Sequence, residues 1–214
     1  MSNPSFIRAR TPEAKAARRA TILAAAAELL ALGGLEHTTL SAIALTAGIT
    51  KSNIYRYFES REEILMRLLA KDLQAASESL ACALTPRPLP EVAATLAGGL
   101  AANPRLCLLI SITASTLERN ISTDTLREIK RDMVNSLDTT AAALHTALPE
   151  IPLAQAGEAV QTLFILAVGL WPFSTPGPAL AALYEEPEFA VFKQDFGAAL
   201  LRATEVMLRG FARG

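Results

Sequence analysis

Cysteine and histidine, the side chains that most often build metal sites and nucleophilic active sites, are scarce in this sequence. The 214 residues include only two cysteines, Cys82 and Cys107, and two histidines, His37 and His145, and no C-x-x-C spacing occurs. Residues so few and so far apart do not predict a zinc site, and we interpret the cysteines as small apolar core residues. No glycine-rich phosphate loop is present, so the sequence predicts neither an enzyme nor a bound cofactor.

The sequence also lacks the apolar runs that mark exported and membrane-spanning proteins. Its N-terminus is polar and arginine-rich, without the apolar core of a signal peptide. The longest candidate for a span, residues 159–171, is shorter than the roughly 18 residues that a membrane helix needs. We therefore expect a cytoplasmic protein without a membrane span. Binding of the basic N-terminal arm to a membrane surface is not favoured, because large apolar residues do not lie opposite its arginines.

Aromatic residues make up only 6% of the chain, and alanine and leucine supply most of its 51% apolar residues. Both are strong helix formers, and no stretch shows the period-two alternation of a strand. The sequence therefore predicts an all-α fold of about nine helices. Its length suffices for one large domain, or for a small domain followed by a mid-sized one.

Charge is distributed unevenly although the net charge is only −1. Residues 1–58 carry seven lysines and arginines against three acidic residues, a net charge of +4, whereas the remainder carries thirteen against eighteen, a net charge of −5. A basic end on an acidic body fits a protein whose first 60 residues meet a polyanion. An unevenly charged but merely solvated surface explains the same numbers, so charge alone leaves both readings open.

Capping residues and apolar periodicity place the expected helices. Thr11-Pro12-Glu13 is a typical helix start, and the Gly33-Gly34 pair ends that helix. Ser60 and Glu63 have the spacing of a capping box at the start of a long fourth helix. The expected helices cover about 12–33, 41–47, 50–59, 61–84, 90–102, 104–118, 122–147, 153–170 and 188–210. Residues 171–188 are expected to be irregular except for one helical turn near 179–183, and the last helix is expected to bury Phe189 and Phe192.

Residues 41–58 are predicted to form a helix-turn-helix, two short helices joined by a glycine-containing turn. Gly48 can take the left-handed conformation that ends the first helix. In the second helix Ile54 and Phe58 fall on one face and are expected to point inward. Ser52, Asn53 and Arg56 then point outward, with Tyr55 and Tyr57 flanking the inner pair. Such a polar and basic outer face suits the major groove of DNA, where arginine and asparagine make bidentate contacts to bases.

The helix-turn-helix and the residues around it resemble those of a known family. The stretch ATILAAAAELLALGGLEHTTLSAIALTAGITKSNIYRYFESREEIL is similar to the DNA-binding region of TetR-type transcriptional regulators. The resemblance covers about residues 18–66, and Arg61 stands where the family usually has lysine. It implies an N-terminal helix-turn-helix DNA-binding domain at 1–60 and a C-terminal helical bundle at 61–214 that binds an effector and dimerises.

The resemblance also assigns DNA contacts residue by residue. The matching positions are Thr39, Ser41, Thr50, Lys51, Ser52, Asn53, Tyr55, Arg56, Tyr57 and Arg61. Supporting phosphate contacts are expected from Arg8, Arg10, Lys15, Arg18 and Arg19. For the tyrosines, packing in the core is the alternative role, and for the N-terminal arm the alternative is a segment that does not touch DNA.

The C-terminal half is less informative. NPRLCLLISITASTLERNIS and GLWPFSTP look like the effector-binding half of one bacterial subgroup of the same family, and the family dimerises through its last two long helices. Candidate pocket residues are large or polar groups on otherwise apolar helices. They are Leu108, Ser111, Ser115, Phe164, Trp171 and Phe173, and ordinary core packing or capping is the alternative role for each.

The resemblance implies a mechanism as well. A small-molecule effector is expected to favour a conformation that separates the two recognition helices of a homodimer differently, through movement of the fourth helix, and so to release operator DNA. Repression is the usual role in the family. The alternative is a constitutive or architectural dimeric DNA-binding protein without an effector, which would share the first 60 residues.

Overall fold

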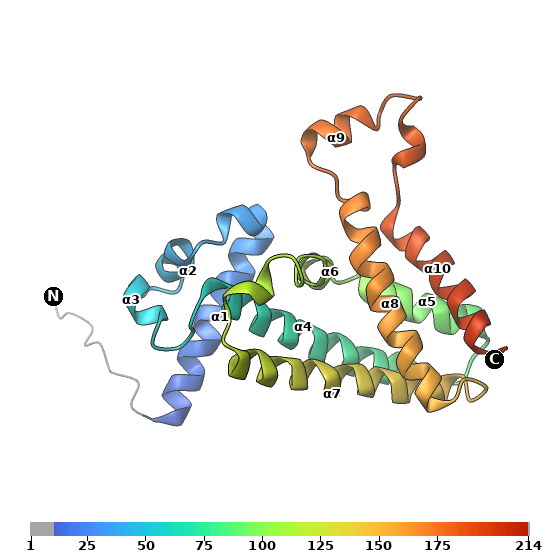
Figure 1. Cartoon of the computed structure of the whole chain (residues 1–214), viewed down its shortest axis with the longest axis horizontal. Helices are drawn as coiled ribbons and strands as arrows, with labels where there is room; N and C mark the ends of the chain where they lie inside the picture. Colours follow the sequence, from blue (N-terminus) through green and yellow to red (C-terminus); the bar gives the residue numbers. More distant parts are fainter. Residues whose placement is uncertain (1–10, 214) are drawn as a thin grey trace.

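Helix boundaries follow the capping residues that the sequence provides. The computed structural model describes residues 11–213, and within this range it contains ten α-helices, two 3-10 helices and no strand (Figure 1). The prediction of an all-α fold is confirmed. Helix α1 (Pro12–His37) follows the N-cap Thr11, whose hydroxyl accepts from the Ala14 amide at 3.2 Å. The helix is interrupted at Gly34, where φ is +67°, as the glycine pair predicts.

The first three helices enclose a small core of their own. α2 (Leu40–Thr46) packs against α1, and α3 (Lys51–Ile54) packs against α2. The buried residues of this core are Ile22, Ala25, Ala26, Ile43, Ala44, Ala47, Ile54, Phe58 and Ile64. Ile54 is 0% and Phe58 is 2% exposed, which confirms that they face inward. Ile64 belongs to the next helix, α4 (Arg61–Ala83), which therefore completes this core.

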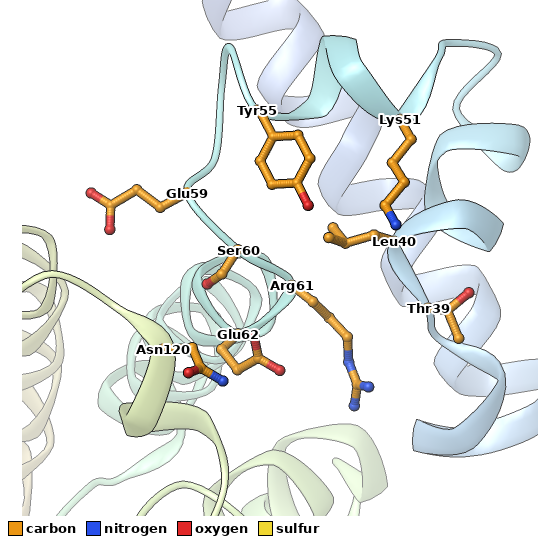
Figure 2. A pocket seen from close by; sticks show the side chains of 9 residues that line it. All are labelled: Thr39, Leu40, Lys51, Tyr55, Glu59, Ser60, Arg61, Glu62 and Asn120. Atoms are coloured by element: carbon orange, nitrogen blue, oxygen red, sulfur yellow. The ribbon is translucent and has the colours of Figure 1, made fainter.

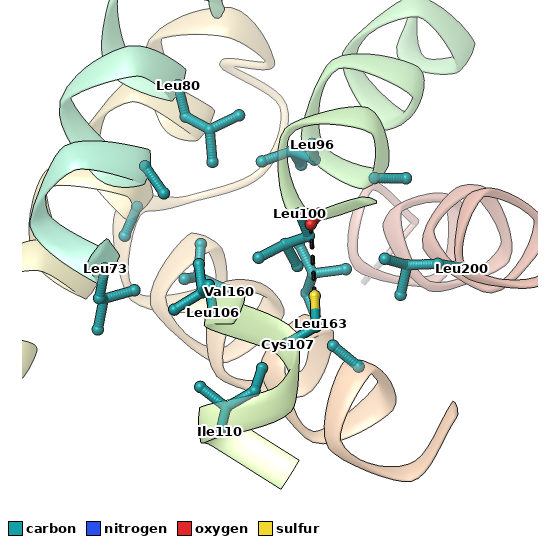
Figure 3. Close-up of a cluster of buried hydrophobic side chains, with 14 of the residues drawn as sticks. Leu73, Leu80, Leu96, Leu100, Leu106, Cys107, Ile110, Val160, Leu163 and Leu200 are labelled. Carbon is teal, nitrogen blue, oxygen red and sulfur yellow. Dashed lines mark hydrogen bonds between the residues drawn. The ribbon is translucent and has the colours of Figure 1, made fainter. Parts of the chain in front are cut away.

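A larger bundle follows, organised around one long helix. This helix, α4, lies along α7 with its N-terminal end beside α1, and α5 lies against α10 (Figure 1). Five helices form most of the bundle. They are α4 (Arg61–Ala83), α5 (Leu89–Ala101), α7 (Thr123–Ala147), α8 (Leu153–Ser174) and α10 (Phe196–Phe211). Leu73, Leu96, Leu106, Leu163 and Leu200 come from different helices and meet in the bundle core (Figure 3). Burial of such leucines is the main stabilising term of this half.

The helix expected over residues 104–118 is shorter, which corrects the prediction. α6 (Pro104–Ser111) ends after eight residues, and a turn leads into the 3-10 helix η1 (Leu117–Asn120). The hydroxyls of Ser111 and Thr113 donate to the carbonyl oxygens of Leu108 and Leu109 at 2.7 and 2.8 Å. Side chains that bond the local backbone in this way compete with helix continuation.

The C-terminal helices also differ from the prediction. α8 continues through Pro172 to Ser174, whose hydroxyl donates to the Leu170 carbonyl at 3.0 Å in the last turn. α10 begins only at Phe196, after the N-cap Asp195 accepts from the Ala198 amide at 2.6 Å.

The segment between α8 and α10 carries the short helices α9 (Pro178–Leu183) and η2 (Ala190–Phe192) and projects from the bundle (Figure 1). The helical turn expected near 179–183 is therefore confirmed. Phe189 and Phe192 lie before α10 rather than on its buried face, and Phe192 is 58% exposed.

Two helices, Pro12–His37 and Leu153–Ser174, are long and apolar enough to cross a membrane by length and composition, and the bent pair Leu89–Ala101 with Pro104–Ser111 would count as a third span if taken together. The prediction from sequence rested on unbroken apolar runs such as residues 159–171, which are shorter than these two helices. α1 packs against α2 and α4, and α8 packs against α6, α7 and α10. Helix packing therefore gives both helices a place inside this fold.

The two cysteines have opposite environments. Cys107 on α6 is fully buried, and its thiol donates to the Leu100 carbonyl at 3.3 Å (Figure 3). Burial raises the pKa of the Cys107 thiol to about 12. Cys82, near the end of α4, is exposed. The interpretation as a core residue is therefore confirmed for Cys107 and wrong for Cys82.

Candidate nucleic-acid interface

The turn between α2 and α3 is fixed by backbone hydrogen bonds. The Ile49 amide donates to the Ala44 carbonyl at 2.9 Å, and the Gly48 amide donates to the Leu45 carbonyl at 3.1 Å. These two bonds form a Schellman motif, in which the residue after the helix takes a left-handed conformation. Gly48 occupies that position with φ of +65°. The angle at which α3 leaves α2 therefore depends on Gly48.

Replacing Gly48 by alanine is expected to lower the free energy of unfolding by about 1–2 kcal/mol. A Cβ at Gly48 would meet no atom within 4 Å, so the cost is conformational rather than steric. Gly98→Ala is the matched control, because Gly98 lies within α5 and its Cβ would also meet nothing. We expect the control to stabilise by about 0.5–1 kcal/mol. Urea unfolding measures both, and equal effects of the two substitutions would contradict this account.

The second helix of the motif is shorter than predicted. Regular helix covers only Lys51–Ile54, and the following turn continues with tighter bonds, from Arg56 N to the Asn53 carbonyl at 3.2 Å and from Tyr57 N to the Ile54 carbonyl at 2.8 Å. The Phe58 amide still donates to the Ile54 carbonyl at 3.0 Å, so both inward side chains remain on one face. We call residues 50–58 the recognition segment.

The outer face of the recognition segment is polar and basic. Thr50, Lys51, Ser52, Tyr55 and Arg56 are exposed. Neither cationic side chain forms an ion pair within residues 11–213. The hydroxyls of Thr50 and Ser52 lie 3.0 Å apart. Charged groups that remain unpaired on a small helix are available to a ligand of opposite charge.

Asn53 and Tyr57 are half-buried at the sides of the same segment. Tyr57 packs its ring against the N-terminal core, which agrees with the alternative role considered for the tyrosines. Thr39 and Ser41 are exposed at the start of α2, and the Thr39 hydroxyl accepts from the Ala42 amide at 3.2 Å. The polar residues expected to meet DNA thus lie on α2, on the recognition segment and on the start of α4.

An open cleft of about 430 Å³ separates α2 and the recognition segment from the start of α4. Thr39, Leu40, Lys51, Tyr55, Glu59, Ser60, Arg61, Glu62 and Asn120 line it. The Tyr55 hydroxyl and the Lys51 ammonium point into this space (Figure 2). The Nε atom of Arg61 is buried and has no hydrogen-bond partner in the described chain. Lys51 and Arg61 thus give the cleft two cationic residues.

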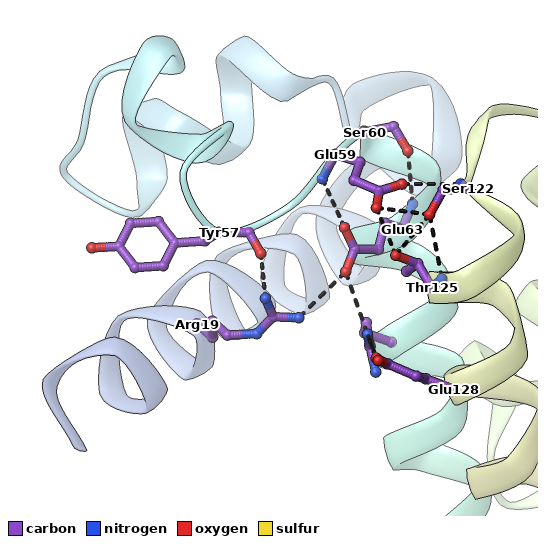
Figure 4. A network of polar contacts seen from close by, with 9 residues as sticks. Arg19, Tyr57, Glu59, Ser60, Glu63, Ser122, Thr125 and Glu128 are labelled. Carbon is purple, nitrogen blue, oxygen red and sulfur yellow. Dashed lines mark hydrogen bonds and ion pairs between the residues drawn. The ribbon is translucent and has the colours of Figure 1, made fainter. Parts of the chain in front are cut away.

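Arg19 was expected to contact phosphate, which stays a prediction, and the structure gives it contacts within the protein. Its guanidinium lies over the Phe58 ring, 4.3 Å from the centroid, and donates to the carbonyl oxygen of Tyr57 (Figure 4). It also forms an ion pair with the buried Glu63 at 3.3 Å. These contacts hold the end of the recognition segment against α1. The pattern of Ser60 and Glu63 had identified the capping residue, but nothing local in the sequence links Glu63 to a residue 44 positions earlier.

The remaining basic residues of the N-terminal part divide into two groups. Arg8 and Arg10 lie outside the described residues. Lys15 is exposed and Arg18 half-buried on the first turns of α1, where phosphate contact stays a prediction.

The candidate effector residues lie on α6, on the turn after it and on α8. These helices pack against each other, and Leu108, Phe164 and Trp171 are half-buried at the edge of the bundle core. Trp171 meets Phe196 edge-on, with ring centroids 5.1 Å apart.

The other three candidates are less enclosed. The hydroxyls of Ser111 and Ser115 donate to nearby carbonyl oxygens, and Phe173 is 65% exposed. The role of all six residues stays a prediction.

Comparison with known sequences gives two matches along the chain. The family model described as "Bacterial regulatory proteins, tetR family" matches residues 22–68, and the model described as "Tetracyclin repressor-like, C-terminal domain" matches residues 65–214. Together they span the helix-turn-helix, α4 and the whole bundle. None of the curated proteins is similar enough in sequence to count as a match.

Solved structures share the fold at low identity. A transcriptional regulator from Rhodococcus sp. Rha1 is 18% identical, with a TM-score of 0.57 over 90% of this chain and 96% of its own. A putative TetR-family regulator from Mesorhizobium loti is 18% identical, with a TM-score of 0.54 over 92% and 96%. The regulator FadR from Bacillus subtilis, in complex with stearoyl-CoA, is 20% identical, with a TM-score of 0.52 over 89% and 98%. At such identities the likeness concerns the fold.

Proposed function

Because the chain belongs to the TetR family of bacterial regulatory proteins, we propose that its recognition segment binds an operator and that a small molecule bound in the bundle releases it. Members of the family are DNA-binding transcriptional regulators rather than enzymes. In this proposal the protein is a homodimeric repressor that acts in the cytoplasm.

The observation that carries the DNA-binding proposal is the unpaired basic face of the recognition segment beside the cleft. We assign Arg56 and Asn53 to base edges, since both side chains can donate in the major groove. Lys51, Arg61 and the Tyr55 hydroxyl are assigned to phosphates. The polar residues Thr39, Ser41, Thr50, Ser52 and Tyr57 complete the proposed interface. The position of Arg61 in the lining of the cleft supports this assignment, because a guanidinium can donate to phosphate oxygens.

The proposed dimer uses α8 and α10, which pack against each other in one chain. Large apolar side chains remain exposed on both helices, with Ile165 70% and Val206 72% exposed. Exposed apolar groups of this size on adjacent helices fit a two-fold interface between identical chains. Such a dimer can set two recognition segments about 34–36 Å apart, the spacing of successive major grooves.

Replacing Val206 by glutamate is expected to weaken the dimer by at least about tenfold, since a buried unpaired charge opposes association. Val134→Glu is the matched control, because Val134 is 52% exposed on α7, away from the proposed interface. Sedimentation at several concentrations measures the dimer dissociation constant of each variant. A Val206→Glu protein as dimeric as the control would exclude α10 from the interface.

The effector is proposed to carry a large apolar part. The candidate positions Leu108, Phe164 and Trp171 offer apolar contact area, and Ser111 and Ser115 offer hydroxyls at one side. Bacillus subtilis FadR, which shares the fold, is known in complex with stearoyl-CoA. Ligands with a large apolar part commonly bind in pockets between apolar helices.

A gel shift on the DNA upstream of the gene tests the proposal as a whole. We expect binding at low salt that weakens as salt rises, and release on adding an apolar effector. The absence of any binding at low salt would overturn the DNA-binding proposal. Binding that no ligand alters would instead favour the constitutive or architectural role. A ligand screen by thermal shift identifies effectors independently of DNA, because ligands that bind the folded state raise its melting temperature.

A further inference from the structure

Glu59, directly after the recognition segment, makes three hydrogen bonds to a distant part of the chain. Its carboxylate accepts from the Thr125 hydroxyl at 2.6 Å, from the Ser122 hydroxyl at 2.9 Å and from the Ser122 amide at 3.0 Å (Figure 4). Ser122 is the N-cap of α7. Glu59 thus joins the end of the recognition segment to the first turn of a bundle helix, 63 positions away in the sequence.

The main chain of Glu59 is fixed from the other side. Its amide donates to Glu63 Oε2 at 2.7 Å, one residue before the position that a capping box would use. Glu63 is buried and also pairs with Arg19 and with Arg67 at 3.4 Å, and Arg67 reaches Glu128 on α7 at 2.9 Å. Glu59 is therefore the residue at which the recognition segment, α4 and α7 meet.

The two sets of bonds differ in exposure, and this difference decides their roles. The Glu63 side chain is only 4% exposed, so water competes less for its ion pairs. The bonds of Glu59 to Ser122 and Thr125 are exposed, and water competes for each of their atoms. Bonds of this kind can break and re-form without unfolding the protein.

The charge state of Glu59 suits its position. The Thr125 hydroxyl, followed by the amide and hydroxyl of Ser122, lowers the pKa of the Glu59 carboxyl below its usual value. The N-terminus of α7, a helix of 25 residues, also favours a carboxylate. The carboxylate is thus ionised and able to accept all three bonds.

The partner of Glu59 belongs to the segment that leaves α6. Leu117 in η1 is 0% exposed in the bundle core, η1 packs against α4, and Ser122 follows five residues after Leu117. A shift of α6 or η1 inside the bundle therefore displaces Ser122, and with it the atoms that hold Glu59.

From these contacts we infer that Glu59 is a positioning residue of the DNA interface, which fastens the recognition segment to Ser122 and Thr125 and carries the coupling between DNA and the α6–α7 segment. The inference rests on the proposed function, since it concerns regulation of the same DNA-binding surface. Coupling of this kind is reciprocal. DNA bound at the recognition segment must then stabilise residues 119–126, and no effector is needed to observe it.

Hydrogen exchange on the full chain, with and without a duplex of the upstream DNA, tests the inference. In the native protein we expect DNA to slow amide exchange at residues 50–58 and also at 119–126. In Glu59→Ala the protection at 50–58 is expected to persist while that at 119–126 is lost. Without DNA, the same variant should exchange its Ser122 amide about 2- to 10-fold faster, as expected for loss of one such bond.

Two further variants separate coupling from charge. Thr125→Val removes one bond to Glu59 without changing charge. The bond that the Thr125 amide donates to the Ser122 hydroxyl stays intact, so this variant should reduce remote protection as Glu59→Ala does. Glu28→Ala removes the same charge from the exposed side of α1, outside the lining of the cleft, and should leave remote protection unchanged.

Each result of the exchange experiment either supports or overturns the inference. If DNA protects residues 50–58 but not 119–126 in the native protein, the inference is wrong while the proposed function stands. The same holds if protection at 119–126 survives in Glu59→Ala. No protection at 50–58 in the native protein overturns the proposed function and this inference with it.

Discussion

Replacing Phe58 by alanine is expected to lower the free energy of unfolding by about 3–5 kcal/mol, the usual cost of removing a buried phenylalanine. The ring is 2% exposed and fills the small core between α1, α2 and α4. It also supports the Arg19 guanidinium at 4.3 Å. A core of so few residues has little capacity to close the cavity, so we place the loss in the upper part of this range.

Urea unfolding followed by circular dichroism measures the loss. Phe192→Ala is the matched control, because Phe192 is 58% exposed on the projecting segment and its removal should change stability by less than about 0.5 kcal/mol. Operator binding by Phe58→Ala should fail at temperatures where the N-terminal helices have melted. A Phe58→Ala loss as small as that of the control would mean that the ring does not anchor the recognition segment.

Replacing Arg56 by alanine is expected to weaken operator binding by about 10- to 100-fold, which corresponds to the 1–3 kcal/mol of a bidentate base contact. Arg56 is exposed and pairs with no acid in residues 11–213. The free energy of unfolding should therefore stay within about 0.5 kcal/mol of the native value. Titration of labelled operator by fluorescence anisotropy measures the affinity.

Arg87→Ala is the control for this experiment. Arg87 is exposed beyond the C-terminal end of α4, about 35 Å of helix away from the recognition segment at 1.5 Å per residue. The Arg87→Ala substitution removes the same charge as Arg56→Ala. It should change the affinity for the operator by less than about twofold, since charges beyond a Debye length are screened. If Arg56 reads a base, its loss relaxes specificity at one operator position. A loss that is equal for all sequences, with a reduced salt dependence, would assign Arg56 to phosphate instead.

Local signals in the sequence were enough to place most of the N-terminal elements. Thr11, Thr39 and Ser60 act as N-caps through their hydroxyls, and Gly48 adopts the left-handed conformation that its place in the turn requires. These features depend on neighbours within a few residues, which the sequence displays directly. The inward positions of Ile54 and Phe58 followed from helical spacing for the same reason.

Local side-chain bonds and tertiary contacts decided the features that differ from the prediction. The end of α6 depends on hydroxyls turning back to the backbone, and the late start of α10 depends on Asp195 capping rather than on apolar spacing. Arg19 was assigned to phosphate because its charge is visible in the sequence, whereas its acceptors, Tyr57 and Glu63, lie far along the chain. Glu59 was not singled out, since its partners begin 63 positions later.

The unequal environments of the two cysteines have a practical consequence. A thiol reagent at neutral pH meets only Cys82, because the Cys107 thiol is buried and keeps its proton. Cys82 lies near the far end of α4, the helix whose first turn holds the recognition segment. The unaltered chain thus offers a single attachment point for a spin label or fluorophore. In a two-fold dimer, a pair of such labels would report the separation of the two α4 helices without any engineered cysteine.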